Sequence, residues 1–555
     1  MEINVRMVDQ FRNLDPDLLG RYSLTRWKDM PRVLVADPIA AEGVELLGSG
    51  ADVDVKHGLK PAELLEVISS YDALVVRSET KVTPEVVEAA KNLMVIARAG
   101  IGVDNINLEA ATNAGIAVVN APIGNTVAAA EHTVALMLAL ARNVPQAVQS
   151  VKQGEWRRSA FMGIEVRNKV LGVIGLGRVG SEVCRRAQSF GMRLVGFDPF
   201  VTPDYANRMG VELMPLAELL SNSDFITLHT PLTPTTTNLL SHDEFNLLKP
   251  GARLINVARG ELIDENALLE ALDSDRLSAV ALDVFIKEPP DPDSQIINHP
   301  KVIATPHLGA STEEAQREVA IEAAEQVLNV LNGKPARNTV NGPVLSPEVH
   351  QILGPYIPVG VLLGKLLTNL AEGQFVGVTI NYEGEIAEHD TMMLQSAVLE
   401  GLLSPTSSEA VNLINAPMLA KQRGLNITEQ KNTASLEYSS LITATLNTTG
   451  ESITVSGTSL REEPHLVKVN DYWLDVIPSV PYLLFVDNPD HPGSIGAVGT
   501  VAGQNNINIS FMEVGRLSPR GKAMMVLGLD DPIPQDVLAQ INNLPQINDA
   551  RLVKL

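Results

Sequence analysis

Short apolar runs separated by longer amphipathic stretches recur from residue 31 to about residue 340. Each run has the length of a strand, and the stretches between runs have the spacing of helices. Five runs come first, at RVLVAD (32–37), ADVDV (51–55), DALVVR (72–77), LMVIAR (93–98) and IAVVN (116–120). Strands that alternate with helices predict a parallel α/β unit. Residues 125–142 then predict one long apolar helix.

A second series of runs begins at residue 169. Its members are KVLGVI (169–174), RLVGF (193–197), FITLHT (225–230), ARLINVA (252–258), SAVALDV (278–284) and VIATPH (302–307). Six strands are the full count of a doubly wound dinucleotide-binding fold. Residues 311–332 predict a long helix that begins near Ser or Thr and ends near Gly333. We expect this helix to return the chain to the first unit, which would then be discontinuous.

The pattern changes beyond residue 334. Residues 334–347 contain three prolines and a glycine and predict a linker. Residues up to about 480 carry mixed helix and strand signals, typical of an α+β unit. From Tyr482 the order strand, helix, strand, strand, helix, strand predicts a split βαβ sandwich. The predicted division is 1–30 as a poorly ordered extension, 31–130 with 312–340, 131–311, 341–480 and 481–555.

Composition narrows the class of protein. A chain of 555 residues needs several cores, and a net charge of −23 argues against nucleic acid and anionic membranes as partners. A local arginine cluster can still bind an anion, since the Debye length is roughly 8 Å at physiological salt. The single Cys184 excludes an internal disulfide and favours a reducing compartment, the cytoplasm. The longest apolar stretch, 352–370, is interrupted by two prolines and Lys365, so no membrane span is expected.

A glycine loop follows the first strand of the second series. In GLGRVG, Gly175 would make the tight turn, Gly177 would let the backbone approach a pyrophosphate, and Gly180 would let helix and strand pack. The helix N-terminus behind the loop favours an anion. The next strand ends at Asp198, and an acid there suits a ribose 2′-hydroxyl and repels a 2′-phosphate. These residues predict NAD as the cofactor.

Three charged residues follow later apolar runs of the same series. Arg259 can pair with a substrate carboxylate, His307 can take a proton from a hydroxyl, and Glu288 can orient and tune the imidazole. Singly, each has an ordinary explanation as a salt bridge, a structural histidine or a solvated acid. All three at successive strand ends of a dinucleotide fold predict oxidation of a 2-hydroxy acid.

The same segments resemble a family. The runs LINVARGELIDENAL, ALDVFIKEPP and TPHLGAST are similar to the D-isomer-specific 2-hydroxyacid dehydrogenases. VVRSETKV, VIARAGIGVDNIN, APIGNTVAAAEHT and GEWRRSAFMG narrow the resemblance to the D-3-phosphoglycerate dehydrogenase family in its long form. The fold this implies is α/β: a Rossmann-type NAD domain, a flavodoxin-like substrate domain, an α+β middle domain resembling the allosteric substrate-binding domain, and a βαββαβ ACT domain.

The resemblance implies a substrate, a cofactor and residues for each. The substrate would be 3-phosphoglycerate, or 3-phosphooxypyruvate in reverse, entering serine biosynthesis. Its contacts would be Arg77, Ser78, Arg98, Gly100, Asn125 and Arg158, although spacing does not tell Arg158 from Arg157. Arginines suit both a carboxylate and a phosphate. The contacts to NAD would include Arg178, Val179, Thr230, Ala258, Asp283 and Gly309 besides the glycines and Asp198.

The resemblance also implies regulation and assembly. ACT domains of this family bind serine at a dimer interface, which would involve Asp490 and Asn508, so a homo-oligomer, a dimer or tetramer, is expected. Asn488 departs from the His or Tyr common at that loop. In the middle domain, Lys421 and Arg423 form either an anion site or, more simply, a solvated basic pair. Two alternatives stay open: another hydroxyacid dehydrogenase, such as a glyoxylate or hydroxypyruvate reductase, and a non-catalytic NAD-sensing protein.

Overall fold

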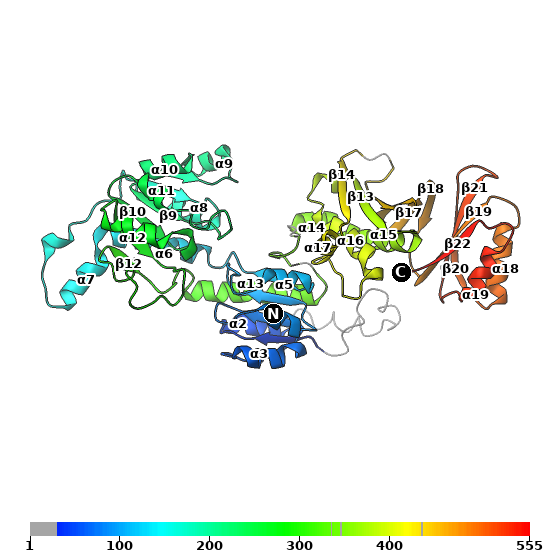
Figure 1. Ribbon diagram of the computed structural model, residues 1–555, viewed down its shortest axis with the longest axis horizontal. Coiled ribbons are helices and arrows are strands. Elements are labelled where there is room, and N and C mark those ends of the chain that lie inside the picture. Colours follow the sequence, from blue (N-terminus) through cyan, green and yellow to red (C-terminus); the bar gives the residue numbers. More distant parts are fainter. Residues whose placement is uncertain (1–29, 335, 344–346, 435–436) are drawn as a thin grey trace, which may run out of the picture.

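The computed structural model describes residues 30–334, 336–343, 347–434 and 437–555 (Figure 1). The predicted extension therefore lies outside the described residues, except for Met30. The described chain forms four sheets, each in its own lobe of the molecule. Every apolar run identified in the sequence is a strand of one of the first two sheets.

The first sheet has the strand order β2-β1-β3-β4-β5, and all of its strands are parallel. This is the order of flavodoxin-like folds. Helices α2 to α5 connect the strands. The elements are β1 (Arg32–Val35), α2 (Ala41–Gly48), β2 (Asp52–Val55), α3 (Pro61–Val67), the 3-10 turn η1 (Ile68–Ser70), β3 (Ala73–Val76), α4 (Pro84–Ala89), β4 (Val95–Arg98), α5 (Leu108–Asn113) and β5 (Ala117–Asn120).

The second sheet has the order β12-β11-β10-β9-β6-β7-β8 and is also parallel. This is the Rossmann order with one added strand at an edge. The elements are α6 (Thr126–Arg142), α7 (Val144–Lys152), η2 (Arg158–Phe161), β6 (Val170–Ile174), α8 (Arg178–Ser189), β7 (Arg193–Phe197), α9 (Pro203–Arg208), β8 (Val211–Leu213), α10 (Leu216–Asn222), β9 (Phe225–Leu228), α11 (His242–Asn246), β10 (Ala252–Asn256), η3 (Gly260–Leu262), α12 (Glu265–Asp273), β11 (Leu277–Leu282) and β12 (Val302–Ala304).

The predicted count of six strands was one too low. The additional strand, β8, has three residues, of which only Val211 is buried. A single buried side chain produces no apolar run, so the pattern could not reveal an edge strand of this length.

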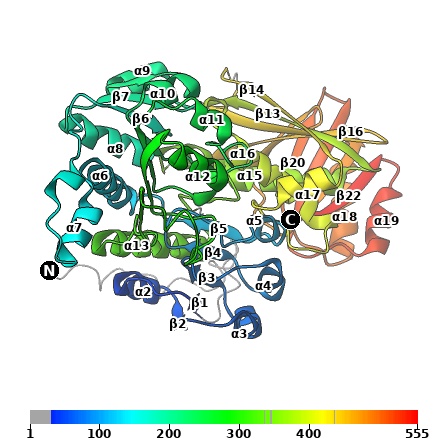
Figure 2. The same ribbon diagram turned by 60° about the vertical axis from the view of Figure 1, so that its left-hand side comes forward.

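Helix α13 (Glu313–Leu331) leaves the second sheet and packs on the first. The Thr312 hydroxyl accepts a hydrogen bond from the Ala315 N–H and caps the helix. Val319, Ala323 and Val327 lie in one core with the strands of the first sheet. Figure 2 shows α13 on the same side as α2. The chain therefore crosses between the two lobes twice, after β5 and before α13.

The middle lobe is a six-stranded sheet, β14-β13-β15-β16-β17-β18, packed against α15 and α16. Its elements are α14 (Pro347–Leu353), η4 (Gly354–Tyr356), α15 (Ile357–Leu370), β13 (Phe375–Gly384), η5 (Glu385–Glu388), α16 (Met392–Leu403), η6 (Ser404–Thr406), α17 (Ala416–Gln422), β14 (Asn426–Asn432), β15 (Ser440–Thr448), β16 (Ser452–Leu460), β17 (Glu463–Val469) and β18 (Tyr472–Val476). Within the described residues, the segment Glu348–Leu370 is long and apolar enough to span a membrane, but Leu363 and Leu366 are fully buried in this core.

The C-terminal lobe has the predicted βαββαβ order and a sheet arranged β20-β21-β19-β22. Its elements are β19 (Tyr482–Pro489), α18 (Ser494–Gln504), β20 (Ile509–Arg516), β21 (Lys522–Leu529), α19 (Gln535–Asn542) and β22 (Asp549–Lys554). One face of the sheet packs on α18 and α19. On the other face, Phe485, Val526 and Val553 join the core of the middle lobe. The last two lobes therefore share one core, at the right of Figure 1.

Candidate active site

Three neighbouring strands carry the predicted catalytic residues at their carboxyl ends. β10, β11 and β12 are adjacent and parallel, so their ends meet at one edge of the sheet, in the region where open α/β sheets bind ligands. Arg259 follows β10, Glu288 follows β11 and His307 follows β12. Nδ1 of His307 lies 2.7 Å from Oε2 of Glu288, and Oε1 of Glu288 accepts a hydrogen bond from the Phe285 N–H.

The surroundings of Glu288 keep it ionised. Burial tends to raise its pKa, but the hydrogen bond and charge of His307, together with the Phe285 N–H, outweigh burial and hold the pKa of Glu288 below its ordinary value. An ionised carboxylate accepts a proton-bearing nitrogen, so Nδ1 of His307 is the protonated nitrogen in the neutral ring. Nε2 is then left to accept a proton.

Asp283 organises the backbone on which His307 stands. Its side chain is fully buried. Oδ1 accepts hydrogen bonds from the Thr305 hydroxyl at 2.6 Å and the Leu308 N–H at 2.8 Å, and Oδ2 accepts one from the Gly309 N–H at 2.8 Å. Burial raises the pKa of Asp283, but hydrogen bonds, the largest from His132, outweigh burial and lower it overall. The backbone of His307 is held in the left-handed region, with φ of 53°.

Arg259 lies between the first two lobes. Nε donates a hydrogen bond to Oδ2 of Asp104 at 3.0 Å, across the gap to the loop after β4. Nη1 donates to the carbonyl of Ala258 at 2.7 Å. Asn256 at the end of β10 fixes the turn, because its amide donates to the Arg259 carbonyl and accepts from the Ala258 N–H. A Cβ atom on Gly102 would lie 1.7 Å from Nη2 of Arg259, so this glycine leaves the space that the guanidinium fills.

Arg98, the last residue of β4, and Arg77, which directly follows the adjacent strand β3, extend this positive cluster. Burial, and then the charges of Arg259 and Arg77, lower the pKa of Arg98 to about 10. Nε of Arg98 is buried and has no hydrogen-bond partner. The guanidinium covers Gly100, where a Cβ atom would lie 1.7 Å from Nη1. A buried cation with an unused donor costs free energy unless an anion pairs with it, so the cluster is built for an anionic ligand.

The other predicted substrate residues are placed differently. Ser78 is exposed beside Arg77. Asn125 is buried at the start of α6, and its Oδ1 has no hydrogen-bond partner. Arg158 is exposed at the start of η2, which follows α7 in the chain. Its neighbour Arg157 pairs with Glu155. Among the described contacts, none joins Arg158 to the arginine cluster.

The glycine loop has the geometry that a dinucleotide requires. Gly175 has φ of 94°, and a Cβ atom there would lie 2.6 Å from the carbonyl oxygen of His229. A Cβ atom on Gly180 would lie 2.0 Å from the Gly175 carbonyl oxygen, so helix α8 packs directly on the loop. A Cβ atom on Gly177 would meet nothing within 4 Å, which leaves room for a pyrophosphate at the helix N-terminus. The residues present therefore fit NAD.

Asp198 directly follows β7, and one of its oxygens bonds to the glycine loop. Oδ2 accepts a hydrogen bond from the Leu176 N–H at 2.8 Å, and Oδ1 accepts one from the Phe200 N–H at 2.9 Å. A carboxylate has further lone pairs for a ribose hydroxyl. Thr230, after β9, has a buried hydroxyl without a partner, so it can bind a ligand group.

The remaining predicted cofactor residues surround the same edge. Arg178 is exposed and Val179 is half-buried in the first turn of α8. Ala258 precedes Arg259, and Gly309 is buried against Val257 and Asp283. The structure therefore brings these residues and the catalytic trio to the carboxyl edge of one sheet.

Sequence reasoning missed three residues that build the site: Asp104, Asn256 and His132. Asp104 stands in VIARAGIGVDNIN, but only Arg98 and Gly100 of that run drew attention. Asn256 could have been found as the polar end of an otherwise apolar strand. Nothing in the sequence near His132 indicates its contact with the site, because its partner Asp283 is 151 residues away in the chain.

The predicted effector residues lie apart in one chain. Oδ2 of Asp490 accepts hydrogen bonds from the Arg520 N–H and from Arg516, and these lower the pKa of Asp490. Asn508 instead donates to Asp530. Because Asp490 contacts the Arg516 end of β20 and Asn508 precedes the other end, no ligand of serine's size can touch both in one chain. Asn488 is buried, and its Oδ1 has no partner.

In the middle lobe, Arg423 donates to the hydroxyls of Thr406 and Ser407. Both Lys421 and Arg423 are exposed. This arrangement favours the solvated basic pair over an anion site.

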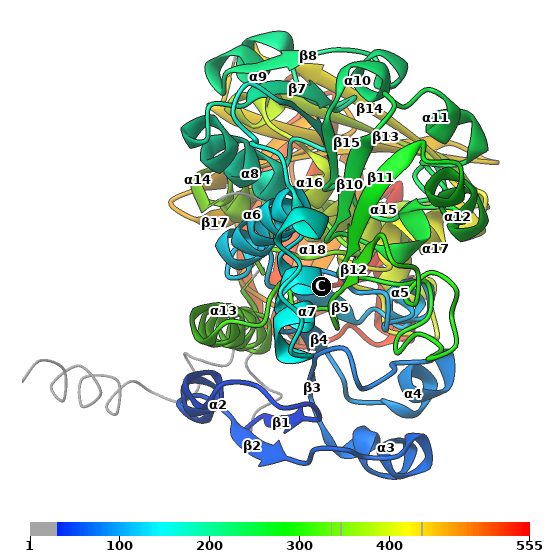
Figure 3. The same ribbon diagram turned by 90° about the vertical axis from the view of Figure 1, so that its left-hand side faces the viewer.

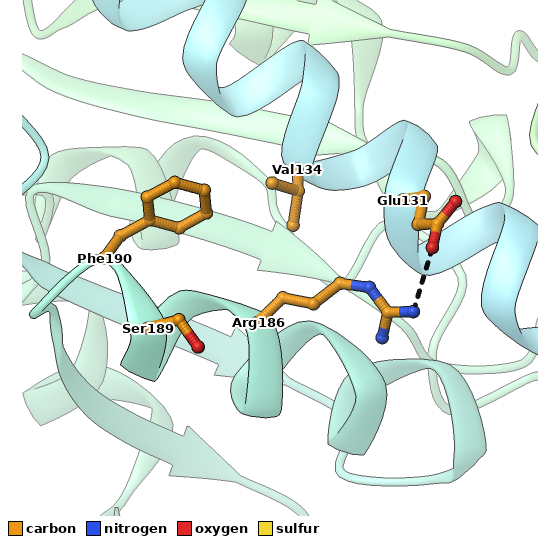
Figure 4. Close-up of a pocket in the computed structure, with 5 residues that line it drawn as sticks. All are labelled: Glu131, Val134, Arg186, Ser189 and Phe190. Carbon is orange, nitrogen blue, oxygen red and sulfur yellow. Dashed lines mark hydrogen bonds and ion pairs between the residues drawn. The ribbon is translucent and has the colours of Figure 1, made fainter.

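Two cavities in the described structure are lined by residues other than Arg259, Glu288 and His307. A cavity of about 240 Å³ lies between α6 and α8, where Arg186 pairs with Glu131 beside Phe190 (Figure 4). A second, also of about 240 Å³, lies along α13 near Glu322 and Arg337. Within the described residues, no group of three or more His, Cys, Asp or Glu side chains could hold a metal ion.

Comparisons with known proteins agree with this geometry. A family model described as the NAD binding domain of D-isomer specific 2-hydroxyacid dehydrogenase matches residues 134–309. A model of the D-3-phosphoglycerate dehydrogenase intervening domain matches residues 352–470, and an ACT domain model matches residues 482–546.

Similar curated proteins extend over nearly the whole chain. The D-3-phosphoglycerate dehydrogenase of Synechocystis sp. is 44% identical over 95% of this chain and 95% of its own. That of Methanocaldococcus jannaschii is 44% identical over 95% and 100%, and that of Bacillus subtilis 40% over 95% and 100%. The chain belongs to the D-3-phosphoglycerate dehydrogenase family. Arg259, Glu288 and His307 thus stand at the strand ends of a member of that family.

Solved structures match a little over half of the chain. The TT0316 protein from Thermus thermophilus is 37% identical, the match covers 56% of this chain and 99% of that one, and the TM-score is 0.52. A glyoxylate reductase from Paecilomyes thermophila is 28% identical, the match covers 57% and 99%, and the TM-score is 0.53. Nearly the whole of each solved chain therefore corresponds to just over half of this one.

Proposed function

We propose that the chain oxidises 3-phospho-D-glycerate to 3-phosphooxypyruvate with NAD, the first step of the phosphorylated route to serine. The single observation that carries the proposal is the cluster of Arg77, Arg98 and Arg259. A buried guanidinium with an unused donor, next to two more guanidiniums, suits a substrate with both a carboxylate and a phosphate. Glycerate without its phosphate would leave part of this charge unpaired.

The residues divide the reaction between them. Arg259 holds the carboxylate and polarises the oxygen at C2, and Arg77 and Arg98 hold the remaining negative charge. Ser78, Gly100 and Asn125 complete the substrate wall. Nε2 of His307 accepts the hydroxyl proton, while Glu288 fixes the ring through Nδ1 and stabilises the imidazolium that forms. NAD supplies the acceptor for the hydride from C2. Gly177, Arg178 and Val179 lie at its pyrophosphate, Gly175 and Gly180 shape the loop and its packing on α8, and Asp198 binds its ribose.

The domains follow from these roles. We assign residues 31–130 with 312–340 to the substrate domain, 131–311 to the NAD domain, 341–480 to the middle domain and 481–555 to the ACT domain. The packing of α13 on the first sheet supports the discontinuous substrate domain. The buried Cys184, whose pKa burial raises to about 12, has no disulfide partner and supports a cytoplasmic location.

A glyoxylate or hydroxypyruvate reductase is the second candidate, and the shared dehydrogenase unit of the Paecilomyes thermophila enzyme is the observation that favours it. The test is NADH consumption by the purified protein. Faster turnover of 3-phosphooxypyruvate than of hydroxypyruvate, by at least ~10²-fold in kcat/KM, supports the proposal, because two charge-assisted hydrogen bonds are lost without the phosphate. Equal turnover of both substrates, or preference for glyoxylate, overturns it. NADH binding without turnover of any of these would leave a non-catalytic sensor.

Regulation by serine is part of the proposal. Asp490 and Asn508 face different ends of β20, so a shared site needs two copies of the ACT domain and therefore a homo-oligomer. Adding L-serine to the NADH assay tests this. Suppression of turnover that Asp490→Ala abolishes supports the site, and indifference to serine in the wild type removes it.

A further inference from the structure

Asp104 joins the substrate domain to the catalytic arginine of the NAD domain. It lies in the loop after β4, its side chain is 61% exposed, and Oδ2 is 3.0 Å from Nε of Arg259. Exposed ion pairs add little to the stability of a fold. The contact between Asp104 and Arg259 therefore contributes little to the stability of the fold, and its main effect is to fix the position of Arg259.

The hydrogen bonds of Arg259 show what the contact does. A guanidinium has five N–H donors in one plane. Asp104 takes the Nε donor and the Ala258 carbonyl takes one from Nη1, so these two fixed points set the plane and rotation of the group. Nη2 lies over Gly102. Both Nη2 donors and one Nη1 donor stay free for a substrate carboxylate.

Charge gives a second reason for an acid at this place. Arg77, Arg98 and Arg259 repel one another, and Arg259 and Arg77 both disfavour the charged form of Arg98. Asp104 and Asp37 are the carboxylates that act in the opposite direction. Asp37 is itself bound to the Arg77 N–H and to Thr80 on the side of the first lobe. Of these two carboxylates, it is Asp104 that bonds to the guanidinium of Arg259, which belongs to the second lobe.

We propose that Asp104 is a positioning residue for the reaction: it holds Arg259 in its substrate-binding orientation across the two lobes, and Gly102 provides the space for that orientation. The proposal rests on the proposed role of Arg259. It applies to the step in which the substrate carboxylate binds, and not to cofactor binding, because Asp104 lies on the substrate domain, away from the glycine loop.

Two substitutions test it from the two sides of the contact. Asp104→Ala removes the acceptor from Nε, and Gly102→Ala places a Cβ atom 1.7 Å from Nη2 of Arg259 and 2.7 Å from Oδ2 of Asp104, so it forces the pair out of its present geometry while both side chains stay in the chain. Gly102 does not have a positive φ, so alanine is compatible with its backbone. We expect each to raise KM for 3-phosphoglycerate by about 10- to 100-fold, the loss of one charge-assisted hydrogen bond or its geometry. Asp104→Asn, which keeps an acceptor, should recover part of the loss. The double variant should lose less than the product of the two effects, because both act on one group.

KM for NAD, NADH binding by fluorescence and the thermal midpoint should change little, and Glu88→Ala, an exposed acid on α4, should behave as the wild type. An unchanged or lower KM for 3-phosphoglycerate in Asp104→Ala overturns the proposal, the lower value because Asp104 would then merely compete with substrate. A parallel loss of NADH binding, or independent multiplicative effects, also overturns it. If the wild type fails to turn over 3-phosphoglycerate, the proposed function fails first, and the two failures are thus distinguished.

Discussion

Nδ1 of His307 lies 2.7 Å from Oε2 of Glu288, although the two residues follow different strands. Burial would raise the pKa of Glu288, but the hydrogen bond from His307 overcomes burial and holds the pKa below its ordinary value. A depressed carboxyl pKa means that the pair contributes stability above the ordinary carboxyl range and loses it only as the pH falls through the lower value. Glu288 is therefore ionised over the whole neutral range.

Glu288→Gln should lower kcat by about 10²-fold, because the imidazolium formed in the reaction loses its counter-charge and its orientation. Steady-state rates at neutral pH check this. Glu265→Gln, an exposed acid on α12, is the control. A kcat like that of the wild type would mean that Glu288 does not act through His307.

Asp198→Asn should change the choice of cofactor. The amide oxygen can still accept from the Leu176 N–H, so the glycine loop keeps its shape, but the charge that repels a 2′-phosphate is gone. The ratio of kcat/KM with NADP to that with NAD should rise by about 10- to 100-fold, one to two factors of 1.4 kcal/mol. Parallel assays with the two cofactors measure it, with the exposed Asp204→Asn beside them. If the ratio stays like that of the wild type, Asp198 stabilises the glycine loop but does not select between NAD and NADP.

The strands, the glycine loop and the position of Arg259, Glu288 and His307 after neighbouring strands could be predicted because each depends on local sequence. A buried parallel strand is a continuous apolar run, and a residue after such a run lies at the edge of the sheet that binds ligands. The ion pair of Arg259 with Asp104 could not be predicted, because it joins residues 155 apart in two lobes. The strand β8 was hidden by its length. The spacing also could not show that the ACT sheet shares its core with the middle domain.

Arg98→Met should separate stability from function. Methionine fills similar space without a charge, and the buried, unpartnered Nε disappears. The free energy of unfolding without substrate should rise by about 1 kcal/mol, within the range for an unsatisfied buried group. KM for 3-phosphoglycerate should rise by at least ~10-fold. Urea denaturation and initial rates measure the two effects, and the exposed Arg317→Met on α13 is the matched control. A variant that is less stable than the wild type would show that Arg98 is satisfied in the folded state.

Glu400 should make stability depend on pH. It is partly buried on α16, and burial raises its pKa to about 7, with Lys365 of α15 lowering it in part. For an acid with a raised pKa, the folded state binds more protons, so stability falls as the pH rises from about 4.5 to 7. Glu400→Gln should therefore match the wild type near pH 4 and exceed it by up to about 3 kcal/mol at pH 8. Urea midpoints at both pH values check this against the exposed Glu409→Gln. Equal differences at both pH values would exclude titration as the cause.

Truncation should show which lobes fold together. A chain that ends at residue 343 keeps both parallel sheets and α13, which packs on the first of them. It should unfold cooperatively and bind NADH.

A chain that ends at residue 480 removes Phe485, Val526 and Val553 from the core they share with the middle domain and exposes the apolar side chains beneath them. Arg551, which bonds to the Leu370 carbonyl at the end of α15, is lost as well. The longer fragment should therefore bind a hydrophobic dye and aggregate, whereas the shorter one should not. The face that the last two lobes share is at the right of Figure 1, and the first two lobes face the viewer in Figure 3. If the longer fragment stays soluble and the shorter one binds the dye and aggregates, the middle domain is stable without the ACT domain, and the ACT domain is free to move relative to it.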